Sequence, residues 1–330
     1  MKSKRKITLY ILLAVTWILG SLFGTSCGFS SSQSSKTVTD YFGREISIPE
    51  KVERVVPIYY VMAEYICAMG ARDKIVGIGL VYANNYLLDK FCPAVYEIPE
   101  IGRGGLNLES LVELEPDVVI CSKNEEMVES IENLGIVAFG TFPNTVKDIF
   151  QQIQDTGVIV GKEDQAGKIV DFQKSRLEYV TSRTRDLTDD ERPTVYYMRE
   201  EFLETMGHGI LSDIIALAGG KNVAEALGES GRPMMVSLEN VYQWNPEIII
   251  IRDRSQITVQ DVYAEPTWQG IEAVRAQRVY KEHLGWTEFR TETIFGIMEK
   301  ATWFQPALFD ELDVDDEYQQ FLDLIASFYE

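Results

Sequence analysis

Two stretches, 130 positions apart, carry one pattern: Asn107-Leu-Glu-Ser-Leu-Val-Glu-Leu-Glu-Pro-Asp-Val-Val-Ile120 and Ser237-Leu-Glu-Asn-Val-Tyr-Gln-Trp-Asn-Pro-Glu-Ile-Ile-Ile250. Each opens with a residue type that caps helix N-termini, and each has a glutamate two positions later, Glu109 or Glu239. Each predicts a short helix that ends at proline, followed by an apolar run typical of a strand buried on both faces. The repeat therefore predicts two lobes of one architecture.

Strands and helices alternate around each copy, which predicts parallel sheets covered by helices. Between the copies, Lys162 to about Leu187 has no proline and no glycine after Gly167, and its apolar residues follow helical spacing. One helix of some 25 residues would span roughly 38 Å. The predicted fold is α/β, with two Rossmann-like lobes joined by one long, rigid helix. We expect a first lobe over 37–160, the connecting helix over 161–188 and a second lobe over 189–330.

Two segments of the first lobe have weaker patterns. Lys74–Ile78 is predicted to be its second strand. Tyr82–Tyr96 shows no clear period, so we expect a long surface loop there.

The body of the chain contains three cysteines, Cys67, Cys92 and Cys121. Their odd number and wide spacing are typical neither of a disulfide framework nor of a zinc site. Cys67 falls in an apolar helical segment and Cys121 at the end of a buried strand, so we expect both to be inert core thiols.

The first 26 residues have a basic head, an apolar stretch over Ile7–Leu22 and small residues before Cys27. This pattern predicts a signal peptide over 1–26, lipidation of Cys27 and a serine-rich flexible tether over 27–36. A plain N-terminal membrane anchor is the alternative. We expect an extracytoplasmic protein that is lipid-anchored to the cell membrane, or periplasmic.

Charge argues against a nucleic-acid partner. Removing residues 1–26 takes four of the 31 basic residues, which leaves 27 against 51 acidic residues and a net charge of −24. Such a surface repels nucleic acids and anionic lipid headgroups. We therefore expect no nucleic-acid partner, contact with the membrane only through the lipid, and a monomer.

An enzyme is not predicted, because the chain has no Gly-x-Ser-x-Gly motif and no glycine-rich phosphate loop after a strand. His208 and His283 are its only histidines, too few for the sites that bind bare zinc or manganese. A metalloenzyme or a cell-surface interaction lipoprotein remains the alternative from another class. It would need a metal-ligand cluster or an exposed apolar patch.

Glu64 and five segments carry a family resemblance: Val38-Thr-Asp-Tyr-Phe-Gly-Arg-Glu-Ile-Ser-Ile-Pro49, Arg54-Val-Val, Ala68-Met-Gly-Ala-Arg-Asp-Lys-Ile-Val-Gly77, Ala218-Gly-Gly-Lys-Asn-Val223 and Val236-Ser-Leu-Glu239. In this order and spacing, the chain resembles the substrate-binding proteins that serve ABC importers of ferric siderophores, haem and cobalamin. The resemblance implies a ligand held between the two lobes. It also implies the importer's permease and ATPase as partners.

A bulky chelate needs apolar walls, aromatic faces and a few polar groups, and the chain has 16 Tyr, 15 Phe and 5 Trp. In sheets of this kind the ligand lies at the carboxyl ends of the strands. The candidate ligand-binding residues are Tyr59, Tyr60, Met62, Arg103, Arg199, Phe202, His208, Trp286, Phe289 and Arg290. For each, an ordinary role in the core or in a surface ion pair is the alternative.

The resemblance favours two of these candidates. Arg103 stands four residues before Asn107, where ferric-hydroxamate binders carry a ligand-contacting arginine, and Trp286 stands where the cobalamin binder has a pocket tryptophan. The resemblance also implies that Glu109 and Glu239 dock onto arginines of the permease, one in each transmembrane subunit. The alternative for the two glutamates is that they only complement helix dipoles.

We therefore expect a lipoprotein that delivers an iron(III)–siderophore complex to an ABC importer, with no resident cofactor or metal. Haem or a corrinoid is the second choice, with His208, His283, Tyr59 or Tyr60 as an axial ligand. A small oxyanion such as molybdate is the third.

Overall fold

The structure, a computed structural model, describes most of the chain from Ser35 onward. The described ranges are 35–58, 60–79, 86–102, 106–122, 124–227, 232–286 and 289–330, with only the backbone of Tyr60. The predicted signal peptide and Cys27 lie outside these ranges. Within them, no helix is both long and apolar enough to cross a bilayer.

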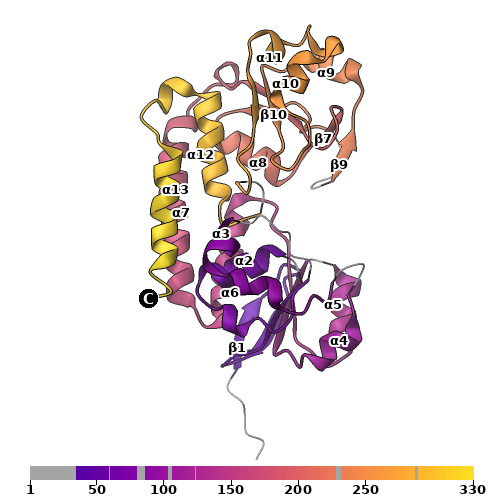
Figure 1. Cartoon of the computed structure of the whole chain (residues 1–330), viewed down its shortest axis with the longest axis vertical. Helices are drawn as coiled ribbons and strands as arrows, with labels where there is room; N and C mark the ends of the chain where they lie inside the picture. Colours follow the sequence, from indigo (N-terminus) through magenta and orange to yellow (C-terminus); the bar gives the residue numbers. More distant parts are fainter. Residues whose placement is uncertain are drawn as a thin grey trace, which may run out of the picture. The chain divides into compact units, whose positions relative to one another are not determined.

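The first lobe, indigo to magenta in Figure 1, is built on a parallel sheet in the order β3-β4-β5. Its elements are β3 (Val55–Pro57), α2 (Tyr60–Ala68), α3 (Tyr86–Phe91), α4 (Leu108–Glu113), β4 (Val118–Ser122), α5 (Glu125–Glu132), β5 (Ala138–Thr141) and α6 (Val146–Val160). A hairpin of β1 (Ser35–Thr39) and β2 (Glu45–Pro49) precedes them. All of β5 and four of the five residues of β4 are buried, as expected for strands covered on both faces.

The second lobe is built on a parallel sheet in the order β11-β10-β6-β8. Its strands are β6 (Thr194–Met198), β8 (Lys221–Asn222), β10 (Ile248–Ile251) and β11 (Val279–Lys281), with a separate antiparallel pair of β7 (Glu204–Met206) and β9 (Pro233–Met235). Its helices are α8 (Ile210–Leu217), α9 (Leu238–Trp244), α10 (Val259–Ala264), α11 (Glu272–Arg275), α12 (Thr293–Phe304) and α13 (Val314–Ala326). Two parallel sheets in one chain confirm the predicted fold class.

The two copies of the repeat fold alike. The side chains of Asn107 and Ser237 cap α4 and α9, each accepting the amide three residues later at 3.1 Å. Beyond each helix, Glu115 and Asn245 occupy the same position with φ of 41° and 42°. These left-handed residues turn the chain into the proline and then into β4 or β10.

The acidic residue directly after each proline also makes the same contact in both copies of the repeat. The carboxylate of Asp117 accepts the amide of Arg54 at 2.9 Å, and the carboxylate of Glu247 accepts the amide of Thr194 at 2.8 Å. Each acid thereby fixes the start of the first strand of its own lobe. The sequence repeat alone did not predict this function of the acid.

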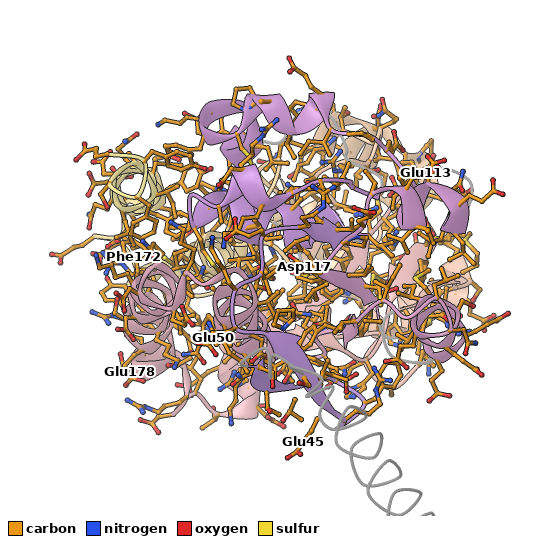
Figure 2. All side chains as sticks on the ribbon, turned by 90° about the horizontal axis from the view of Figure 1, so that it is seen from below. Glu45, Glu50, Glu113, Asp117, Phe172 and Glu178 are labelled. Carbon is orange, nitrogen blue, oxygen red and sulfur yellow. A yellow bond between two sulfur atoms is a disulfide. The ribbon has the colours of Figure 1, made fainter. Side chains whose placement is uncertain are left out.

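Helix α7 (Glu163–Thr184) is the predicted connecting helix. It buries the stripe formed by Ala166, Ile169, Val170 and Val180, while Glu178 on its other side is exposed (Figure 2). Helices α6, α12 and α13 pack against it.

The last helix, α13, returns the chain to the first lobe. Arg176 of α7 pairs with Glu317 of α13 at 2.8 Å. The ring of Tyr329 stacks on Phe91 at 5.7 Å, and its hydroxyl donates to the carbonyl of Cys67. Helix α13 and the C-terminal residues thus form a second link between the lobes.

The prediction of a long loop over Tyr82–Tyr96 was wrong. Helix α3 and a 3-10 turn at Pro93–Glu97 occupy most of it, and they bury Leu87, Leu88 and Val95. A six-residue helix is too short to show a clear period. Residues 82–85 lie outside the described part.

The predicted strand Lys74–Ile78 is reduced to two isolated bridges, Val55 with Ile75 and Ile78 with Glu100. Because only single residues pair on either side, no ladder extends along this segment.

The cysteine prediction was wrong for Cys67. It forms a disulfide with Cys92, and their Cα atoms lie 6.0 Å apart. Helix α3 folds back onto α2 and brings together residues that sequence spacing does not relate. Cys121 is a buried free thiol, and burial raises its pKa to about 12, as expected for an inert group.

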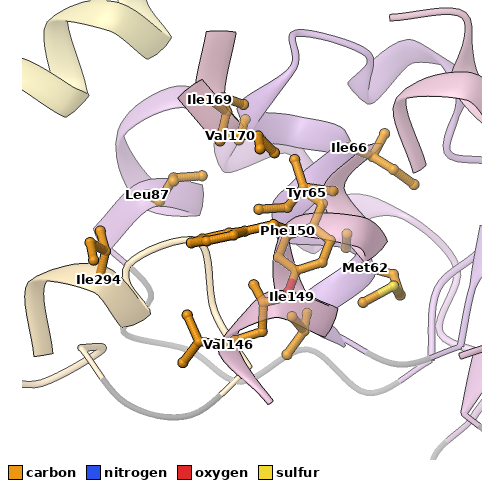
Figure 3. Close-up of a cluster of buried hydrophobic side chains, with 14 of the residues drawn as sticks. Met62, Tyr65, Ile66, Leu87, Val146, Ile149, Phe150, Ile169, Val170 and Ile294 are labelled. Atoms are coloured by element: carbon orange, nitrogen blue, oxygen red, sulfur yellow. The ribbon is translucent and has the colours of Figure 1, made fainter. Parts of the chain in front are cut away.

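The core extends from the first lobe to α12. Figure 3 shows Tyr65 and Phe150 packed in it, with Ile169 from α7 and Ile294 from α12 nearby. The lobes are therefore joined by apolar packing as well as by α7.

Candidate functional site

The carboxyl ends of the parallel strands define the candidate site. In the first lobe, Ile58 and Phe142 directly follow β3 and β5. In the second lobe, Arg199, Arg252 and Glu282 directly follow β6, β10 and β11. Loops at this edge of such a sheet are where α/β proteins bind small molecules.

One ring contact joins the two edges. Phe142 of the first lobe and Phe289 of the second lie with ring centroids 5.6 Å apart, tilted by 47°. Phe289 was predicted from the sequence and Phe142 was not, although Phe142 directly follows a buried strand. This aromatic pair joins the end of β5 in the first lobe to the loop between β11 and α12 in the second.

The first lobe and α7 hold the segment that follows Phe289. The Tyr65 hydroxyl donates to the Phe289 carbonyl at 2.6 Å, and Gln173 donates to the Thr291 carbonyl at 2.9 Å. Glu64 Oε1 lies 3.5 Å from Arg290 Nη1, and both side chains are at most 2% exposed. Removing one partner of such a buried pair typically costs about 3–5 kcal/mol.

Arg290 is therefore part of a buried ion pair between the lobes, and its predicted contact with ligand stays a prediction. The carboxyl of Glu292 is also buried near Arg290. Burial raises the pKa of Glu292, and the nearby Arg290 opposes that rise.

The arginines after β6 and β10 have acidic neighbours. Arg199 Nε lies 3.7 Å from Glu204, and its Nη1 donates to the Met206 sulfur at 2.9 Å. Arg252 forms an ion pair with Glu200. Sequence reasoning missed Arg252 and Arg254, although both follow a buried isoleucine run as Arg199 follows β6.

His283 and Trp286 stack with ring centroids 4.1 Å apart. Trp286 is only 4% exposed, and its indole N–H has no hydrogen-bond partner among the described residues. The two rings line a cavity of about 540 Å³ together with Glu299, four residues of the α12–α13 connection and the first two residues of α13: Asp310, Glu311, Leu312, Asp313, Val314 and Asp315. A cavity with so many carboxylates repels an anion.

The carboxyl of Glu299 lies on the wall of this cavity and is largely buried. Burial raises its pKa to about 7, while Lys300 and the amide of His283 act in the opposite direction.

The remaining predicted residues are spread around the second lobe and the core. Met62 is 1% exposed and packs in the core (Figure 3). Phe202 packs edge-on against Trp268 at 5.5 Å. His208 is exposed and lies 4.0 Å from Glu225. Tyr59, Arg103 and the side chain of Tyr60 lie outside the described residues.

In the described ranges, no group of three or more His, Cys, Asp or Glu side chains is placed to hold a metal ion. A second cavity, of about 360 Å³, lies between α7, α8 and β8. The polar groups on its wall bond to the fold itself, because Arg192 donates to three main-chain carbonyls and Asn222 donates to Met206, Gly207 and Ser212. Arg192 and Asn222 on the wall of this cavity therefore stabilise the fold through these hydrogen bonds.

Glu109 and Glu239 are exposed in the first turns of α4 and α9. Val112 and Tyr242, three residues later, are also exposed, at 47% and 43%. Each copy of the repeat thus places an exposed acid and an exposed apolar side chain on the same face of its helix, and in α4 the exposed Glu113 lies on that face as well.

Comparison with known proteins places this geometry in a family. The family model described as periplasmic binding protein matches residues 55–283. The molybdate-binding protein MolA of Haemophilus influenzae is 26% identical over 88% of this chain and 92% of that protein. The ABC transporter substrate-binding lipoprotein YvrC of Bacillus subtilis is 22% identical over 85% and 90%.

The fold agrees with that match. A periplasmic solute-binding protein from Veillonella parvula superposes with a TM-score of 0.76 and 27% identity, over 90% of this chain and 93% of the other. The family model covers most of both lobes and all of α7, so the match includes the two strand edges and the connecting helix. The chain belongs to the periplasmic binding protein family.

Proposed function

We propose that this protein captures an iron(III)–siderophore complex between its lobes and delivers it to an ABC importer. The family and the relatives support a solute-binding role and do not point to catalysis. The observation that carries the proposal is the contact between Phe142, which directly follows β5 of the first lobe, and Phe289, in the loop that follows β11 of the second. A ligand there would contact both lobes.

The chemistry of this edge favours a ligand with an oxygen-rich, partly apolar surface. Aromatic faces offer flat walls to a chelate, and guanidinium groups bind its oxygen shell. Arg199 and Arg252 lie at this edge, where Arg199 is paired with Glu204 and Arg252 with Glu200. An anionic ligand would compete with these carboxylates for the arginines, while a bare cation would find no ligand cluster among the described residues.

A molybdate-type oxyanion is the second candidate, and the similarity to MolA over most of both chains is what favours it. Arginine side chains would serve a small oxyanion as well as a chelate. The two candidates differ in size and in colour, which makes them separable by experiment.

The test is to purify the protein from its native host and identify the bound molecule by absorbance and mass spectrometry. A broad ligand-to-metal band together with iron in the protein fraction is the expected result. Molybdenum without iron would favour the oxyanion, and a Soret band would favour haem. Titration of the stripped protein with each candidate serves as the control, and the absence of binding to all of them would overturn the proposal.

We also propose that Cys27 carries the lipid and that Glu109 and Glu239 dock onto the permease. The lipoprotein relative YvrC supports the first. The matched exposure of the two glutamates, with Val112 and Tyr242 beside them, supports the second. Exposed charge pairs at such an interface mainly fix orientation and speed encounter.

A further inference from the structure

The segment 289–293 belongs to the second lobe by sequence, because it lies between β11 and α12. Three of its neighbours belong to other parts of the chain. Tyr65 and Glu64 of α2 contact Phe289 and Arg290, and Gln173 of α7 contacts Thr291.

The residues that hold the segment are inaccessible to any ligand. Glu64 and Tyr65 are 0% exposed and Gln173 is 1% exposed. Tyr65 and Gln173 donate to main-chain carbonyls, so they fix the path of the backbone whatever side chains it carries.

The backbone conformation of Phe289 depends on such contacts. Its φ is +71°, a left-handed conformation that residues other than glycine adopt only when the surroundings impose it. The hydrogen bond from Tyr65 is made to the carbonyl of this same residue, and the Phe289 ring then lies against Phe142. The first lobe thus sets the direction of an aromatic ring that the second lobe supplies.

We propose that Tyr65 and Glu64 are positioning residues of the ligand site. Through them, α2 of the first lobe fixes the position of the Phe289 ring of the second lobe in the ligand-free protein. The inference rests on the proposed function, because it places the ligand against Phe142 and Phe289. It adds that residues remote from the ligand determine the affinity.

Tyr65→Phe is the test variant, and Tyr41→Phe is its matched control. The Tyr41 hydroxyl also donates to a main-chain carbonyl, that of Asp148 at 2.9 Å, but within the first lobe. Both variants lose one hydroxyl and keep the ring. The first measurement is hydrogen–deuterium exchange of peptides covering 289–293 in the ligand-free protein. The second is the Kd for a ferric tris-hydroxamate, a ferric tris-catecholate and molybdate.

Tyr65→Phe is expected to speed exchange over 289–293 and to weaken the probe that wild type binds by about 3- to 10-fold, the range for one lost hydrogen bond. Tyr41→Phe is expected to change neither. Glu64→Gln, which keeps the shape of the side chain, repeats the test should Tyr65→Phe fold poorly.

Unchanged exchange over 289–293 would overturn the inference, and so would faster exchange with wild-type affinity. If the wild type binds none of the three probes, the proposed ligand class fails. The exchange comparison then decides alone whether α2 positions the segment.

Discussion

At the scale of single residues, Glu299 links the cavity beside Trp286 to stability. It lies on α12 and faces a cavity that also contains Asp315, while Lys300 and Glu282 lie close to it. Burial raises its pKa to about 7 in the folded protein, against an ordinary value of 4.5. The fold therefore prefers the protonated carboxyl, and the unfolded chain releases that proton at lower pH.

The pKa of Glu299 is higher in the folded protein than in the unfolded chain, so the fold is most stable relative to the unfolded chain while Glu299 is protonated. The contribution of Glu299 to stability is fully present below pH 4.5 and is lost as the pH rises through about 7. Glu299→Gln removes the titration, so its melting temperature at pH 8 should exceed that of wild type by about 2–4 °C. Glu311→Gln, an exposed carboxylate on the same cavity, is the control. Equal pH dependence in wild type and Glu299→Gln, measured by calorimetry from pH 5 to 8, would contradict the assignment.

The expectation that a ligand lies at the carboxyl ends of strands predicted some residues of the candidate site and missed others. It identified Arg199 and Phe289 because each belongs to a loop at a strand end. The same rule applied to β5 and β10 would have added Phe142 and Arg252. Sequence could not show that Arg290 is buried against Glu64, because that contact depends on how the two lobes pack.

At the scale of elements, the long helix and the repeat were predictable because their patterns run over many residues. The 22 residues of α7 carry a stripe that no short strand could mimic. Helix α3 has six residues, and tertiary packing of Leu87 and Leu88 defines it more than its own pattern does. The disulfide was missed for the same reason, since Cys92 follows this helix.

The disulfide between Cys67 and Cys92 is expected to stabilise the first lobe by closing a loop with a sequence separation of 25 residues. Cys67→Ala with Cys92→Ala should lower the free energy of unfolding by about 2–4 kcal/mol, as for other natural disulfides. Urea unfolding with and without a reducing agent measures this loss.

Two controls separate the disulfide from a general effect of thiols. Reductant should destabilise wild type and Cys121→Ala alike, since Cys121 is a free thiol, and it should not affect the double alanine variant. A wild-type midpoint that reductant does not move would show that the bond adds no stability.

At the scale of the whole molecule, two similar lobes expose a glutamate at equivalent positions of the repeat, Glu109 on α4 and Glu239 on α9. An importer permease made of two equivalent transmembrane subunits would offer two equivalent basic contacts. Under the proposed function the repeat would serve both folding and delivery, because one part of it leads into a buried strand and its exposed glutamate would contact the permease.

The delivery role is tested most directly by uptake of the identified ligand into cells that carry Glu109→Ala with Glu239→Ala in place of the wild-type protein. We expect uptake to be abolished while the purified variant keeps wild-type ligand affinity and melting temperature, because both side chains are exposed. Normal uptake by the double variant, or a loss of ligand binding as large as the loss of uptake, would contradict it.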